Sequence, residues 1–133
     1  MNMTIDELLE MPYWVADILP RQVPRDSPGQ YFAIERHYLR EPQITAIKQR
    51  HIDLVLKLNC YYDLSLDDER EVNPAPARIA REMRDRYVCL RLGDALIVSE
   101  PDDTCLTIYN PDGELLELLH ALAMGEGLFV WQP

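Results

Sequence analysis

Three β-prone segments separated by tight turns occupy residues 87–109, and they restrict the fold more than any other part of this chain. The first two, YVCLRL and ALIVS, are separated only by Gly93 and Asp94. Glycine readily adopts the positive φ that a two-residue hairpin turn requires. The turn EPDDT then leads to the third segment, CLTIYN. Strands joined by such short turns pair as antiparallel neighbours, so the sequence predicts a largely antiparallel sheet.

Helical patterns flank these strands. Thr4 and Glu7 have the spacing of a capping box and predict a helix over residues 4–11. Pro42 suits the first turn of a second, amphipathic helix, which should end near residue 56 and carry Lys48 on its outer side.

Two further helices are expected after the Asn-Pro pairs at 73–74 and 110–111. Residues 13–19 and 128–133 have the composition of short strands. We therefore expect a single globular α+β domain over residues 1–133, in which three to four helices pack on a sheet of about five to six strands.

In two other segments, side chains alternate between two sides as they do in a β-strand. Residues 31–39 place Phe32, Ile34 and Tyr38 on one side, and residues 56–67 alternate over their whole length. In the second segment Cys60 shares its side with leucines and is expected in the core, while Asn59, Tyr61 and Asp63 should face solvent or a neighbouring element.

The formal net charge of the 133 residues is −10, and it is unevenly distributed. Residues 21–60 carry net +3, whereas residues 61–133 carry −9. This acidity argues against nonspecific nucleic-acid binding and favours solubility or a basic partner. A nucleic-acid site formed by arginines would require five of them to lie on the same face of the protein. They are Arg21, Arg25, Arg36, Arg40 and Arg50.

The N-terminus lacks a basic start and an apolar run, and no apolar stretch reaches membrane-spanning length. The three cysteines are an odd number without a CxxC pair, which favours free thiols and a cytoplasmic location. We expect no membrane association.

Several segments together resemble an uncharacterised family of small acidic bacterial proteins. They are DILPRQVP (17–24), GQYFAIERHYL (29–39), LKLNCYYDLSL (56–66), YNPDGELLELLHALA and the terminal EGLFVWQP. The resemblance implies a shared fold and no particular activity.

No motif for a phosphate loop, a nucleophile elbow or a zinc protease occurs. The acidic residues of segment 63–71 do not have the ligand spacing of a calcium-binding loop. Glu35 and His37 together would supply only two metal ligands. We therefore expect no metal, no cofactor and no assigned catalytic residue.

Long irregular loops are often functional, so the proline-rich segment 14–31 is a candidate surface, or else a stiff crossover that packs Trp14 onto the core.

The main hypothesis is a non-enzymatic cytosolic protein that binds a protein partner of basic character, as an immunity protein does, or a second copy of itself. The alternative is a small enzyme or ligand binder with a pocket near Glu35, His37 and Asp63. The candidate surface residues are Trp14, Arg21, Arg25, Glu35, His37, Asn59, Tyr61 and Asp63.

Overall fold

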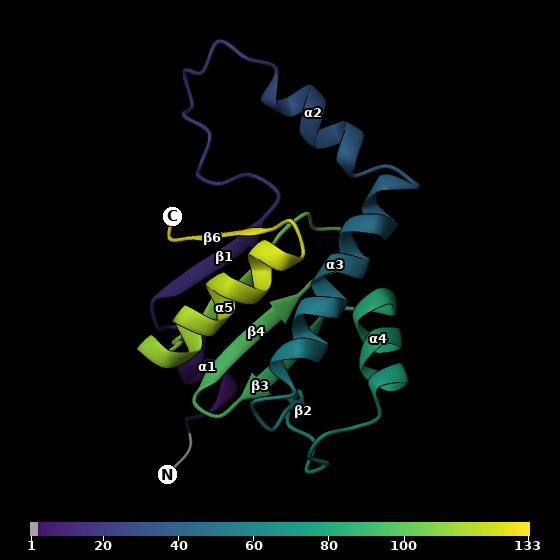
Figure 1. Cartoon of the computed structure of the whole chain (residues 1–133), viewed down its shortest axis with the longest axis vertical. Helices are drawn as coiled ribbons and strands as arrows, with labels where there is room; N and C mark the ends of the chain where they lie inside the picture. The colour runs from purple at the N-terminus through teal and green to yellow at the C-terminus, as the bar shows by residue number, and fades with distance from the viewer. Residues whose placement is uncertain (1–2) are drawn as a thin grey trace.

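The computed structural model describes residues 3–133 and has an α+β architecture built on one antiparallel sheet (Figure 1). The six strands have the order β2-β3-β4-β5-β1-β6, and every neighbouring pair is antiparallel. Their bounds are β1 Tyr13–Asp17, β2 Ser65–Leu66, β3 Val88–Leu92, β4 Ala95–Ser99, β5 Leu106–Tyr109 and β6 Phe129–Trp131. The predicted fold class is confirmed.

The expected hairpin forms the centre of this sheet. β3 and β4 pair from Val88↔Ser99 to Leu92↔Ala95, which leaves Gly93 and Asp94 as the two-residue turn. Gly93 has a φ of 58°, the conformation that the glycine was expected to supply.

Five helices are present in residues 3–133, and most of them cover one face of the sheet. The main hydrophobic core lies between that face and residues of α3, α4 and α5, and includes Leu54, Leu58, Ile79, Leu90 and Leu119. The short α1 lies on the opposite face, where Leu8 packs against Cys89 and Leu96. The helices are α1 Ile5–Leu8, α2 Tyr31–Tyr38, α3 Gln43–Leu58, α4 Pro76–Asp85 and α5 Gly113–Gly125.

The strand predicted at residues 31–39 was wrong, because this segment forms α2. Phe32, Ile34 and Tyr38 fit the spacing of a strand, but Tyr31, Ile34 and Tyr38 also fit the spacing of a helix. Tyr31 donates a hydrogen bond of 2.7 Å to Glu35 one turn later, which fits a helix and not a strand.

The long strand predicted at residues 56–67 was also wrong. α3 continues to Leu58, a turn follows, and only Ser65–Leu66 joins the sheet. Leu58 extends the helical spacing of the buried Ile47, His51 and Val55, so the α3 core continues into the segment. Cys60 is consequently exposed and not buried in the core as expected.

No helix among residues 3–133 combines the length and the apolar character needed to cross a bilayer.

Candidate functional site

All candidate residues except Trp14 occupy two regions that lie at opposite ends of α3. Arg21, Arg25, Glu35 and His37 belong to the segment of residues 18–42, here called the arm, which extends beyond the end of the sheet before α3 begins (Figure 1). Asn59, Tyr61 and Asp63 follow the other end of α3. A helix of 16 residues is about 24 Å long, so the two regions are separate surfaces.

Glu35, His37 and Asp63 are therefore not brought together. Glu35 lines a small cavity of about 30 Å³ between α2 and the end of β1, and Asp63 is not among its lining residues. His37 is exposed on α2.

Trp14 belongs to β1 and pairs with Ile108 of β5, which places it on the same side of the sheet as Ala16 and the main core. It is half-buried. Its place in the sheet puts Trp14 outside the irregular loop, which begins after β1.

Asn59 and Asp63 are held by Asn73. The Asn73 Oδ1 accepts hydrogen bonds of 2.9 Å from the Leu64 amide and of 2.9 Å from the Asn59 side chain, and its Nδ2 donates one of 2.9 Å to Asp63. Asn73 has a φ of 57°, which asparagine tolerates better than most residues. These polar groups shape the turn after α3.

We expect Asn73→Ala to lower the free energy of unfolding by about 2 kcal/mol, because it removes these bonds and places an alanine at positive φ. Urea denaturation of this variant and of Asn73→Gly separates the two effects, since glycine relieves only the backbone strain. Equal stability of Asn73→Ala and the parent would show that the bonds contribute nothing.

Tyr61 takes no part in these hydrogen bonds and lines a groove of about 490 Å³. It is 67% exposed. The other lining residues are Tyr62, Glu114, Glu117, Leu118 and Ala121, and we call this feature the α5 groove. Its four α5 residues recur at helical spacing and form one stripe, which Met124, itself 70% exposed, continues by one turn.

The α5 groove combines apolar surface with unneutralised negative charge. Neither Glu114 nor Glu117 forms an ion pair with another residue of the described chain. Both carboxylates are exposed, whereas Leu118 is half-buried between them and the core. Such a surface can bind an amphipathic segment that presents a cation beside an apolar side chain.

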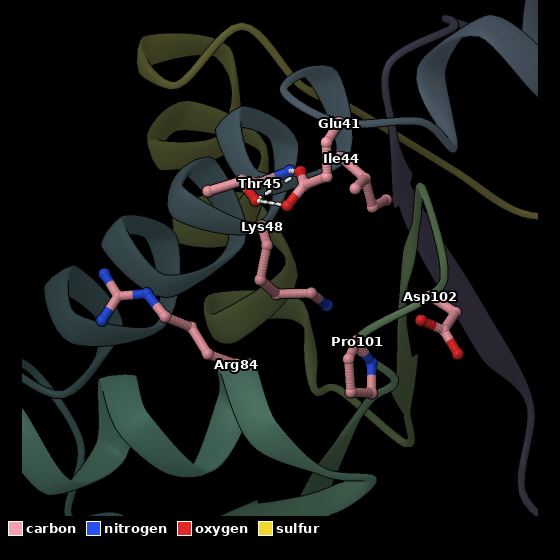
Figure 2. Close-up of a pocket in the computed structure, with 7 residues that line it drawn as sticks. All are labelled: Glu41, Ile44, Thr45, Lys48, Arg84, Pro101 and Asp102. Carbon is pink, nitrogen blue, oxygen red and sulfur yellow. Dashed lines mark hydrogen bonds between the residues drawn. The ribbon is translucent and has the colours of Figure 1, made fainter.

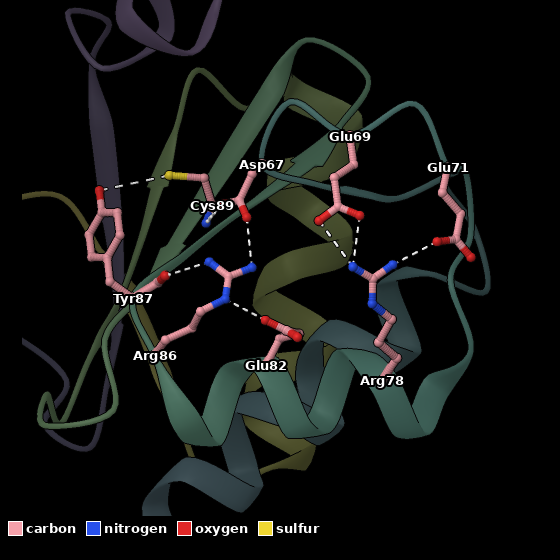
Figure 3. A network of polar contacts seen from close by, with 8 residues as sticks. All are labelled: Asp67, Glu69, Glu71, Arg78, Glu82, Arg86, Tyr87 and Cys89. Carbon is pink, nitrogen blue, oxygen red and sulfur yellow. Dashed lines mark hydrogen bonds and ion pairs between the residues drawn. The ribbon is translucent and has the colours of Figure 1, made fainter.

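Three acids of the turn after β2 have ion-pair partners. Glu69 and Glu71 bind Arg78 at 2.7 and 2.6 Å, and Asp67 binds Arg86 at 2.7 Å (Figure 3). Asp67 also accepts from the Cys89 amide at 3.1 Å. These acids therefore tie the turn after β2 to α4 and β3. No set of three His, Cys, Asp or Glu side chains in residues 3–133 is arranged to hold a metal.

Lys48 was expected on the outer side of its helix, but only 4% of it is exposed. Its ammonium group donates to Ser99 Oγ at 3.1 Å and to the Glu100 carbonyl at 2.7 Å. Burial lowers the pKa of Lys48 to about 8, although nearby acids such as Asp103 act in the opposite direction. Lys48 lies four residues after Ile44 and four before Ile52, so helical spacing would have placed it on the inner side.

Lys48 also borders a cavity of about 220 Å³ (Figure 2). Glu41 and Asp102 bring negative charge to this cavity and Arg84 brings positive charge. The Glu41 carboxylate accepts from Thr45, at 3.1 Å from the amide and 2.6 Å from the hydroxyl. Because the polar atoms of Lys48 and Glu41 are used within the protein, the cavity lacks an evident reactive group.

His51, one turn after Lys48, is completely buried, and neither ring nitrogen has a hydrogen-bond partner. Burial, reinforced by Lys48, lowers its pKa to about 3, although the nearby Thr104 backbone acts in the opposite direction. Burial also raises the pKa of the thiols of Cys89 and Cys105. These two thiols thus lack the activation that a cysteine nucleophile needs.

Comparisons of the chain with models of protein families, with curated proteins and with solved structures found no match. The resemblance described from the sequence thus stays a prediction, and the geometry of the α5 groove is the basis for a functional proposal.

Proposed function

We propose that this protein is a non-enzymatic protein-binding protein, and that its α5 groove receives a basic amphipathic helix of a partner. The observation that carries the proposal is the groove itself, where Glu114 and Glu117 flank an apolar stripe and have no partner within the described chain. Tyr61 supports it, because tyrosine buries a large area on binding while keeping a polar end.

The net charge of −10 supports the same partner chemistry, since it steers basic proteins toward the surface and repels acidic ones. The helix-in-groove mode requires apolar anchors and charges at spacings of three, four and seven residues. Glu114, Glu117 or Leu118, and Ala121 have this spacing on α5.

The proposal is tested by titrating a fluorescent synthetic peptide helix that carries Phe, Arg and Leu at positions i, i+4 and i+7. We expect binding that weakens as salt is added, and about tenfold weaker binding for Glu114→Gln/Glu117→Gln and for Tyr61→Ala. Asp85→Asn is the matched control, because Asp85 is an exposed, unpaired acid on α4. Equal binding of a scrambled peptide, or equal weakening by the control, would contradict the proposal.

A small-molecule binder is the second candidate, and the cavity beside Lys48 is what favours it. A ligand there would cover the Lys48 amine, so binding should lower its rate of reaction with acylating reagents. This candidate comes second because the bonds of Lys48 give it a structural role without any ligand.

A further inference from the structure

α2 carries a face that nothing in the described chain covers. None of its eight residues is buried. Tyr31, Ile34, Glu35 and Tyr38 face the end of β1 and Thr104 across the small cavity. Phe32, Arg36 and the C-cap residue Leu39 recur at positions i, i+4 and i+7. Phe32 borders a groove shared with residues 22–29 of the arm, yet 72% of it remains exposed. Isolated helices of this length are marginal in water, so α2 would gain stability from a second contact.

The arm carries four arginines and three acids, Asp26, Glu35 and Glu41, so its net charge of +1 is opposite in sign to that of the α5 groove. Its four arginines are exposed, and none of them forms an ion pair within residues 3–133. They are Arg21, Arg25, Arg36 and Arg40. Arg36 lies between Phe32 and Leu39, as Glu117 lies beside Leu118 and Ala121 in the groove. Each surface therefore places apolar side chains beside a charge, and the two charges are of opposite sign.

α2 cannot reach the groove of its own chain. It joins the N-terminal end of α3 through residues 39–42, whereas Tyr61 lies just beyond the other end of this helix of about 24 Å (Figure 1). A contact between the two surfaces therefore has to involve two molecules.

We propose that the occupant of the α5 groove is α2 of a second copy of this chain, which rests on the proposed function of the groove. Phe32 enters between Tyr61 and Leu118, Arg36 pairs with Glu114 and Glu117, and Leu39 lies against Ala121. Because each copy has one arm helix and one groove at opposite ends of α3, two copies related by a two-fold axis satisfy both contacts at once and close the assembly.

Sedimentation velocity of the full chain over a range of concentrations tests this assembly. We expect a dimer at low salt, and at least tenfold weaker association for Arg36→Glu, Glu117→Arg and Phe32→Ala. The combined Arg36→Glu/Glu117→Arg chain should recover dimerisation, because the charges are exchanged and not lost. This recovery also shows that the single variants fold. Arg81→Glu, at an exposed and unpaired arginine of α4, should dimerise as the parent does.

A parent chain that stays monomeric at every concentration overturns the proposal, as does a dimer that Arg36→Glu and Glu117→Arg leave intact. A mass that increases without limit excludes the closed two-fold arrangement. If the chain is monomeric but still binds the synthetic basic helix at the groove, the self-association fails and the proposed function stands. If both fail, the groove is not a docking surface.

Discussion

Acidification from pH 6.5 to pH 3 should cost the protein about 3 to 5 kcal/mol of unfolding free energy through His51 alone. The pKa of this buried imidazole is lowered from 6.5 to about 3 in the folded state. Between these two values the unfolded chain binds a proton that the folded chain excludes. The contribution of His51 is therefore fully present above pH 6.5 and is lost as the pH falls.

Replacement by an apolar side chain isolates this effect. His51→Leu should flatten the pH dependence in this window and should be as stable as the parent at pH 7, because both ring nitrogens are unpartnered in the fold. The measurement is urea denaturation followed by tryptophan fluorescence at several pH values. His120→Gln is the control, since His120 is exposed on α5. Parallel stability curves for His51→Leu and the parent would contradict the account.

Lys48 should produce the second large effect, in alkaline solution. Its pKa is about 8 in the folded state against 10.5 in the unfolded chain. Between these values the folded protein has released the proton and the unfolded chain still holds it, so the contribution of Lys48 to stability rises with pH. The size of this contribution is about 3 kcal/mol.

Lys48→Met should remove this rise while keeping the length of the side chain. Tyr31 acts in the opposite direction, since its pKa is raised to about 12 in the folded state, but it does so equally in parent and variant. Lys48 lowers the otherwise raised pKa of the Cys105 thiol, so the comparison is made with Cys105→Ser in both chains. The difference between the two stability curves from pH 8 to 10.5 therefore reports Lys48. Lys57→Met is the control, because Lys57 is an exposed lysine paired with Glu126. A constant difference across this range would show that Lys48 is not desolvated.

The parts of the fold that depend on local rules could be predicted from the sequence. The Gly93 turn specified the β3–β4 hairpin, and the capping box of Thr4 and Glu7 starts α1. The helix after Pro42 and the helix of LLELLHALAM were also expected, although the N-cap of α5 is Asp112 and not Asn110. Asn110 instead adopts a φ of 57°, as Asn73 does. Both Asn-Pro pairs therefore belong to the turns that precede their helices and do not cap the helices.

The errors arose where two periodicities fit the same residues. Residues 31–39 and 56–58 satisfy a spacing of two and also the helical spacing, and short segments do not discriminate between them. In the second segment, packing decided the outcome, because Leu58 completes the buried face of α3.

The two proposed docking surfaces could be predicted only in part from the sequence. The arginines of the arm and the exposed Tyr61 were recognised as candidates, but the groove joins Tyr61 to a helix more than fifty positions later. Tertiary contacts of this kind follow no local rule. One signal was available: once Leu115, Leu119 and Ala123 are assigned to the core, α5 retains an apolar and acidic stripe at Glu114, Glu117, Leu118 and Ala121.

The most direct test of the groove as a docking surface is to map the binding of the synthetic basic helix by amide chemical shifts in the full chain. We predict that the shifts concentrate at Tyr61, Tyr62 and residues 114–124, and that Glu114→Gln/Glu117→Gln requires about tenfold more peptide to produce them. Shifts that concentrate instead on α4 or around Lys48, or no shifts at peptide saturation, would contradict the central claim.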